Sequence, residues 1–332
     1  MAWLASRAAR RLLFATGVLV LVAFVWYAGP AAIVERLGAM GPLWPLFLVP
    51  SAVVQLLDTV AWRLTLPRSA RVGFLALLEA RLSGEAVNTL TPTAYVGGEP
   101  VKAIRLAPAV PVAEGLSSVI IGRTLMTAAQ VLFVTIGVAV ALGRFEGDSS
   151  LLAAVAAVVA ATAVGVSWLV RRQREGFVGG LMRLAERAGL RPAWAATRAG
   201  AIADLDARVA RSYREDRARL YQSAAVYLLA WIAGTAETWT ILTLMGLSVD
   251  LQAAFAIEAL SGLAKAVTFV IPASLGGQEG GNVLVFAGFG YPLAVSVGYS
   301  VLRRARELLW AGIGLALLSR RGRTRRGIAR AE

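Results

Sequence analysis

Long apolar runs alternate with short charged segments along the 332-residue chain. Six of these runs approach the length of about 20 residues that a helix needs to cross the hydrocarbon core of a bilayer. Two further segments, 72–110 and 251–290, are apolar but interrupted by proline, glycine and charged residues. The pattern predicts an all-α integral membrane protein with spans at about 12–28, 42–62, 114–142, 150–170, 221–246 and 292–318.

Clusters of arginine predict how these helices are oriented, because Lys and Arg favour the cytoplasmic side. Such clusters precede the first span, follow the second, fill the segment 171–219 and follow the last span. All four lie on one side only if both interrupted segments enter the membrane and return to the side from which they came. The charges therefore predict about six transmembrane helices plus two re-entrant helical hairpins, with both termini cytoplasmic.

The two interrupted segments also resemble each other. Leu82-Ser83-Gly84 recurs as Leu260-Ser261-Gly262, and the glycine-rich tip Pro92–Glu99 recurs as Pro272–Glu279, at an offset of 178 to 180 residues. Because the predicted hairpins open to opposite sides, the two halves form an inverted repeat. Many transporters have this arrangement, with a binding site near the membrane midplane at the repeat interface.

The repeat divides one polytopic domain, 1–332, into four parts. We interpret the first apolar run as a retained helix, because it is long and lacks a clear cleavage site. The segment between the halves alternates Arg and Ala with Asp and Glu, which predicts basic amphipathic helices or a solvated connecting arm. The parts are a first half 1–170, a cytoplasmic basic arm 171–219, a second half 220–318 and a basic cytoplasmic tail 319–332.

Composition narrows the chemistry that the chain can perform. Hydrophobic residues make up 58% of the chain, and Lys and Arg outnumber Asp and Glu by 34 to 20. We assign this excess to topology and to anionic lipid head groups at the basic arm, with no nucleic acid as partner. The absence of Cys and His excludes thiolate nucleophiles, imidazole bases and Cys/His metal sites. We therefore expect no metal, no cofactor and no enzymatic activity.

The hairpin tips and one pair of arginines are the candidate binding residues. Glycine pairs allow positive φ and expose successive N–H groups, and the helix that follows directs its positive N-terminus at the tip, which suits an anion. The tips are alternatively ordinary loops that end a helix. The repeat offset also relates two guanidiniums, which form forks for phosphate-like groups. The predicted substrate-binding residues are Arg123, Arg303, Gly97, Gly98, Glu99, Gly276, Gly277 and Glu279.

Other charged residues within apolar sequence should pair or line a polar interior, because a charge facing lipid costs at least a few kcal/mol. Arg303 shares a helical face with Glu307, which makes Glu307 its first candidate partner. For Arg81 and Glu237, binding a substrate and pairing with a charge on a neighbouring helix are equally good interpretations. Protonation of a buried carboxylate would couple the protein to a proton gradient. The predicted coupling or pairing residues are Glu79, Glu85, Glu258, Lys265, Arg306 and Glu307.

Several segments resemble the lysylphosphatidylglycerol synthase transmembrane-region family, also described as flippase-like, and most closely its branch associated with hopanoid biosynthesis. They are DTVAWRLTLP (58–67), GEAVNTLTPTAYVGGEPVKAIRL (84–106), IEALSGLAKA (257–266), IPASLGGQEGG (271–281) and RRARELLW (303–310). Independently of this resemblance, we expect Asp58, Trp62 and Arg63 to be interfacial anchors, because they close the second predicted span. The resemblance implies a multi-pass bacterial inner-membrane protein that moves or presents a lipid. The aminoacylating members carry a soluble synthase domain after the membrane region, whereas this chain ends at Glu332, so we expect no lysyl transfer.

These observations favour a lipid translocase. Its substrate would be a membrane lipid that is hopanoid-related or carries an anionic head group, moved between leaflets or toward the outer membrane. Two alternatives stay open at this point. One is an intramembrane enzyme, and the other is an accessory subunit of lipid or glycolipid biosynthesis or transport that docks through the basic arm.

Overall fold

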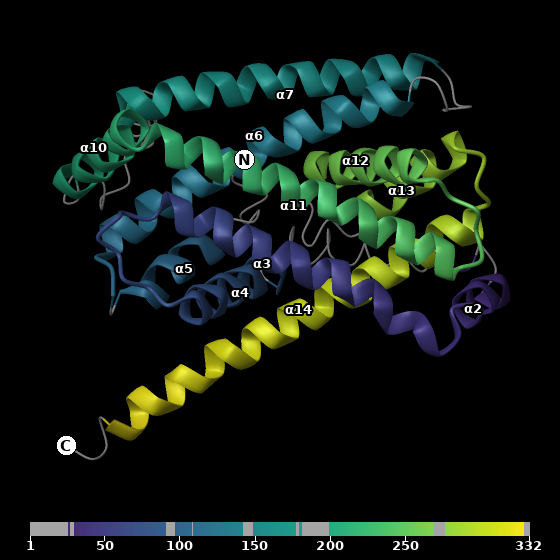
Figure 1. Cartoon of the computed structure of the whole chain (residues 1–332), viewed down its shortest axis with the longest axis horizontal. Coiled ribbons are helices and arrows are strands. Elements are labelled where there is room, and N and C mark those ends of the chain that lie inside the picture. The colour runs from purple at the N-terminus through teal and green to yellow at the C-terminus, as the bar shows by residue number, and fades with distance from the viewer. Residues whose placement is uncertain are drawn as a thin grey trace, which may run out of the picture.

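A computed structural model describes residue 26 and residues 30–90, 97–107, 109–141, 149–176, 179–180, 199–268 and 276–328. Within these residues the chain forms eleven α-helices and one 3₁₀ helix, with no β-strand (Figure 1). The prediction of an all-α protein is confirmed.

The helices follow the predicted order. In the first half they are α2 (Pro30–Gly38), η2 (Gly41–Phe47), α3 (Leu48–Thr65), α4 (Phe74–Leu90), α5 (Gly98–Leu106), α6 (Val112–Ala141) and α7 (Ser149–Glu175). In the second half they are α10 (Ala199–Glu215), α11 (Arg217–Leu244), α12 (Leu251–Val267), α13 (Gly277–Gly288) and α14 (Leu293–Ile328). Helix α7 extends past residue 171 into the predicted arm, and α14 extends into the predicted tail.

Among the described residues, three helical segments are long and apolar enough to cross a membrane: Gly41–Thr65, which joins η2 to α3, then α6 and α11. These three candidate spans coincide with the spans predicted at 42–62, 114–142 and 221–246. Helices α7 and α14 coincide with the segments 150–170 and 292–318, and their crossing of the membrane stays a prediction. The span predicted at 12–28 lies outside the described residues except for Trp26.

Proline sets the limits of α3. Pro50 lies in its first turn, where the missing N–H leaves no helical hydrogen bond unmade. At the other end Leu66 is extended, with ψ of 153°, because it precedes Pro67 and a residue before proline avoids the helical region. The span therefore ends at Thr65 and continues beyond Asp58 and Trp62.

Each interrupted segment forms a pair of helices around its tip. Helix α4 packs on α5, and α12 packs on α13, and the two pairs lie at opposite ends of the molecule (Figure 1). The tip residues 91–96 and 269–275 lie outside the described residues. The segments are therefore helical hairpins, and their re-entrant position in a membrane stays a prediction.

The two glycine pairs have different roles in the backbone. Gly98 has an ordinary helical φ next to the tip, but a Cβ there would lie 1.9 Å from the carbonyl oxygen of Gly84. It allows α4 and α5 to touch backbone to backbone. Gly276 has φ of 77°, a value that favours glycine. The prediction of positive φ is therefore correct for Gly276 and wrong for Gly97, Gly98 and Gly277.

Each half packs long helices against helices of the other half. Helix α3 packs antiparallel on α11: Ser223 donates to the carbonyl of Ala61 at 2.8 Å, while Phe47, near the other end of the pair, belongs to the same hydrophobic core cluster as Ile241. Helix α6 of the first half packs on α12, and α14 of the second half packs on α4. Each hairpin is thus covered by a long helix from the other half (Figure 1).

Helix α10, which lies wholly within the predicted basic arm, is amphipathic as predicted. It buries Val209, Ala210 and Tyr213 and packs against α6 and α7. The Tyr213 hydroxyl donates to the side-chain oxygen of Gln173 at 2.7 Å. Burial raises the pKa of Tyr213 to about 12, so this hydroxyl stays protonated and keeps its donor role at neutral pH. This part of the arm is a packed element of the fold.

Two glycines of α14 provide a test of this packing. A Cβ at Gly314 would lie 2.1 Å from the carbonyl oxygen of Leu82 in α4, whereas a Cβ at Gly312 would meet nothing within 4 Å. We expect Gly314→Ala to destabilise the protein by about 1–3 kcal/mol, because two backbones must separate. Gly312→Ala should stabilise it by up to about 1 kcal/mol, through helix propensity alone. Thermal unfolding in detergent measures both, and equal effects would contradict the α4–α14 contact.

Candidate functional site

A first polar cluster lies between α3, α4 and α5. Arg81 of α4 donates to the carboxylate of Asp58 in α3 and to the side-chain oxygen of Gln55, and the side chains of Arg81 and Asp58 are 9% and 7% exposed. Lys102 of α5 donates to Glu85 of α4 at 2.6 Å and to Glu99 at 3.1 Å. Asp58 and Trp62, expected as interfacial anchors, are instead buried.

This first polar cluster borders a cavity of about 30 Å³, which is room for about two water molecules. Its walls come from α3, α4, α5, α6 and α11. Arg123 of α6 lines the cavity and is exposed, so the cavity reaches the molecular surface at this residue. The lining residues are Trp62, Arg81, Glu85, Glu99, Lys102, Val119, Gly122, Arg123, Met126 and Tyr227.

Arg123 differs from the other cations at this cavity. Arg81 and Lys102 both form ion pairs, whereas Arg123 has no carboxylate within ion-pair distance among the described residues. It lies 11 residues into α6, or about 17 Å along the helix axis, which is about half the thickness of the hydrocarbon core. The cavity therefore presents, well inside an apolar helix, a guanidinium that no carboxylate of the described residues contacts directly.

The helix N-termini at both tips are already occupied by side chains of the protein. The Gly98 N–H donates to Asn88 at 2.7 Å, and the Gly276 N–H donates to Glu279 at 2.7 Å. The first turns of α5 and α13 also carry the carboxylates of Glu99 and Glu279, where a bound anion would gain from the helix dipole. These two N–H groups are therefore not open to a ligand in this structure.

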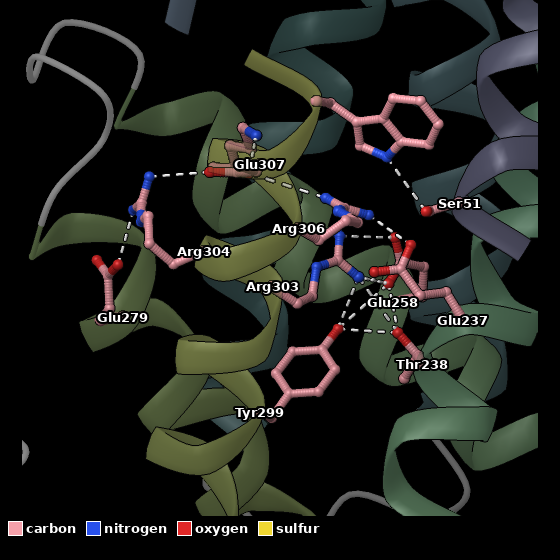
Figure 2. A network of polar contacts seen from close by, with 12 residues as sticks. Ser51, Glu237, Thr238, Glu258, Glu279, Tyr299, Arg303, Arg304, Arg306 and Glu307 are labelled. Carbon is pink, nitrogen blue, oxygen red and sulfur yellow. Dashed lines mark hydrogen bonds and ion pairs between the residues drawn. The ribbon is translucent and has the colours of Figure 1, made fainter. Parts of the chain in front are cut away.

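A second polar cluster is built around Arg303 of α14 (Figure 2). Its guanidinium makes a two-point contact with Glu258 of α12, with Nη2 at 3.1 Å from Oε1 and Nη1 on Oε2. Nη1 also donates to the Tyr299 hydroxyl at 2.8 Å, and Thr238 donates to Glu258. All four residues are buried. The expectation that Glu307 partners Arg303 is wrong, because the partner is Glu258.

Glu307 instead joins three other cations of the second polar cluster. It pairs with Lys265 of α12. It also pairs with Arg304 at 2.9 Å and with Arg306 at 3.9 Å (Figure 2). Arg304 also reaches Glu279 of α13 at 2.7 Å, and Arg306 pairs with Glu237 of α11. The cluster thus ties α11, α12, α13 and α14 together through charges that compensate one another.

The two clusters contain equivalent positions with different partners. Asp58 and Glu237 are 179 residues apart, on the antiparallel helices α3 and α11. Arg123 and Arg303 are 180 residues apart. When Leu82-Ser83-Gly84 is aligned with Leu260-Ser261-Gly262, however, the position equivalent to Glu258 is Ala80. The first half therefore has no equivalent of Glu258, the carboxylate that pairs with Arg303. The cavity that Arg123 lines does not include Arg303.

The remaining predicted pairing residues also find partners. Glu85 pairs with Lys102, and Glu79 lies 3.8 Å from Arg105. Sequence reasoning missed Lys102, Tyr227, Thr238 and Tyr299. Lys102 had a usable signal, because it is one of two lysines in the chain and the other is Lys265. Within the described part of the chain, no group of three or more acidic residues is arranged to hold a metal ion.

Comparison with known proteins places this architecture in a family. Residues 14–315 match the family described as the lysylphosphatidylglycerol synthase TM region. A UPF0104 membrane protein of Methanothermobacter thermautotrophicus is 24% identical over 305 residues, which cover 88% of this chain and 89% of the relative. No solved structure matches the chain. The match covers most of the chain, so the protein belongs to this family of multi-pass membrane proteins.

The Arg303–Glu258 pair gives a test of the second polar cluster. We expect Glu258→Ala to destabilise the protein by about 3–5 kcal/mol, because it leaves a buried guanidinium without compensation. The double variant Glu258→Leu with Arg303→Met should recover most of that loss, since neither charge is then buried. The exposed pair Arg172–Glu175 is the control, with an expected loss below about 1 kcal/mol for Arg172→Ala. Unfolding in detergent measures all three, and independent effects of Glu258 and Arg303 would contradict the pairing.

Proposed function

We propose that this chain, as a member of the lysylphosphatidylglycerol synthase TM region family, is a lipid translocase of a bacterial inner membrane. Its cargo is a lipid with an anionic head group, and a hopanoid-related lipid is the candidate that the resemblance suggests. The chain moves this lipid between the leaflets, or presents it for delivery to the outer membrane. The proposal rests on the first polar cluster and its cavity.

The observation that carries the proposal is the guanidinium of Arg123, which makes no ion pair among the described residues. An arginine within an apolar helix costs at least a few kcal/mol unless it pairs or reaches water, so it marks a functional site. Arg303, its equivalent, is held by Glu258 in a buried pair. Arg123 is exposed and lines a cavity instead. A guanidinium in this position offers two parallel N–H donors to a phosphate group that enters from the surrounding membrane.

The charges beside Arg123 supply the rest of the binding chemistry. The ammonium group of Lys102 contacts both Glu85 and Glu99. It can therefore turn toward an incoming anion by breaking its contact with one carboxylate while it keeps the contact with the other. The Tyr227 hydroxyl lies close to Gly122, where a Cβ would be 3.1 Å from it, and it also faces the cavity. The cavity holds only about two water molecules, so a head group enters when α4 and α5 move away from α6.

The packing of the halves suggests how this movement occurs. A two-fold axis that relates antiparallel α3 and α11 lies perpendicular to the helices, and therefore in the plane of the membrane. That is the symmetry of an inverted repeat, and it supports two hairpins that open to opposite sides. Rocking of one half against the other then exposes Arg123 to each leaflet in turn. Ion-paired Glu85, Glu258 and Glu307 are already compensated, so a proton gradient acts only through a state that breaks these pairs.

A lipid-movement assay tests the role of Arg123. Purified protein in liposomes that contain a phospholipid with a fluorescent head group should move the label between leaflets without chemical change. We expect Arg123→Lys to slow this movement by about tenfold or more, because lysine keeps the charge and loses the two-donor fork. Arg172→Gln, on exposed α7, is the matched control and should move lipid at the unaltered rate.

The same assay separates the other classes of function. A chemically altered lipid would indicate an intramembrane enzyme, and neither movement nor alteration would indicate an accessory subunit. Full lipid movement by Arg123→Lys and by Arg123→Gln, with unchanged thermal stability, would place the cargo site elsewhere.

Two equivalent alanines test the topology. Ala107 follows α5 and Ala287 lies near the end of α13, they are 180 residues apart, and both are exposed. The chain has no native cysteine, so Ala107→Cys and Ala287→Cys each introduce a single thiol. A membrane-impermeant maleimide should label Ala107→Cys from the cytoplasm and Ala287→Cys from outside. Labelling of both from the same side would contradict the inverted repeat.

A further inference from the structure

A second, larger cavity lies where the three apolar spans end together. It has a volume of about 540 Å³ and is bordered by the end of α3, the start of α6, the end of α10 and the start of α11. The spans Gly41–Thr65, Val112–Ala141 and Arg217–Leu244 all have an end at this point. The cavity therefore lies at one boundary between the membrane and water, and its volume is in the range of small-molecule sites.

The cavity is lined by equal numbers of positive and negative side chains, and most of them are already paired. Arg68 pairs with Asp216 at 3.0 Å, and Arg208 pairs with Glu114 at 3.1 Å. The lining also includes the apolar side chains of Leu64, Leu66 and Leu220.

Two charged residues of the lining are left over, and both belong to α10. Arg211 and Glu215 have no ion-pair partner within 4 Å among the described residues, and both are exposed. They are four residues apart, so they lie on one face of the helix about 6 Å apart along its axis. This separation is comparable with the length of a two-carbon link between a phosphate and an ammonium group. One unpaired cation and one unpaired anion thus stand side by side at the membrane boundary.

We propose that this cavity binds the head group of a zwitterionic phospholipid with a primary ammonium group, of the phosphatidylethanolamine type. Arg211 contacts the phosphate, and Glu215 accepts hydrogen bonds from the ammonium group. The apolar leucines contact the glycerol end of the acyl chains. The balanced lining explains the choice, since a purely anionic head group would leave Glu215 repelling it. The site is distinct from the Arg123 cavity, so it acts as an anchoring or regulatory lipid site.

Native mass spectrometry of the purified full chain in detergent tests this site. The probes are phosphatidylethanolamine, phosphatidylglycerol and phosphatidylcholine with the same acyl chains. We expect phosphatidylethanolamine to bind most tightly, because the choline ammonium cannot donate to Glu215. Arg211→Gln and Glu215→Gln should each weaken this binding by about tenfold or more, the usual effect of losing one charged hydrogen-bond partner.

Arg214→Gln is the matched control, because Arg214 is an exposed residue of the same helix that does not line the cavity. It should leave the binding of phosphatidylethanolamine unchanged. Tighter binding of phosphatidylglycerol that is insensitive to Glu215→Gln would overturn the zwitterionic assignment. Equal competition by soluble phosphoethanolamine would overturn the assignment to a lipid, and binding unaffected by either variant would overturn the site. The measurement concerns binding alone, so its failure leaves the role proposed for Arg123 untouched.

Discussion

The structure depends on the high free energy of an uncompensated charge inside a membrane. Lipid tails do not distinguish one apolar helix face from another, so they contribute little to the choice of helix neighbours. A buried ion pair does make that choice, because removing either partner leaves a charge in hydrocarbon. Asp58–Arg81 joins α3 to α4, Glu237–Arg306 joins α11 to α14, and Glu258–Arg303 joins α12 to α14. The polar clusters therefore specify which helices meet.

Small residues make these pairs geometrically possible. Gly98 brings α5 onto the backbone of α4, and this contact lets Lys102 reach the carboxylates of both helices. Gly314 brings α14 onto α4, and Gly137 brings α6 onto Ala259 of α12. The last two contacts are the reciprocal crossings by which each half covers the hairpin of the other. Charge pairing and close backbone approach thus support the same set of helix contacts.

The sequence predicts the fold better than the partners within it. Apolar length located the helices, and the recurrence of Leu-Ser-Gly located two helical hairpins that the structure contains. Contacts between side chains could not be predicted in the same way. Helical spacing placed Arg303 beside Glu307 on one helix, but a residue on another helix, Glu258, approaches its guanidinium end-on and makes two hydrogen bonds. Local periodicity carries no information about which helix lies opposite.

The same limit explains why Asp58 was expected at the interface. Its proximity to Trp62 and Arg63 resembles the end of a span, and only the packing of α4 shows that Arg81 compensates it inside the membrane. The glycine tips show the converse error. Their composition suits an anion, but Asn88 and Glu279, which lie outside the tips' glycine pairs, already accept the N–H groups. A motif indicates what a backbone can do, and its neighbours decide whether that capacity remains available.

The difference between the halves is the feature that favours function over structural pairing. If charged residues served only to hold helices together, we would expect equivalent positions to make equivalent ion pairs. Arg303 is compensated by Glu258, whereas the equivalent of Glu258 in the first half is Ala80, and Arg123 lines a cavity instead. This difference in pairing is the reason for proposing that the second polar cluster supports the fold and that the first polar cluster holds the site.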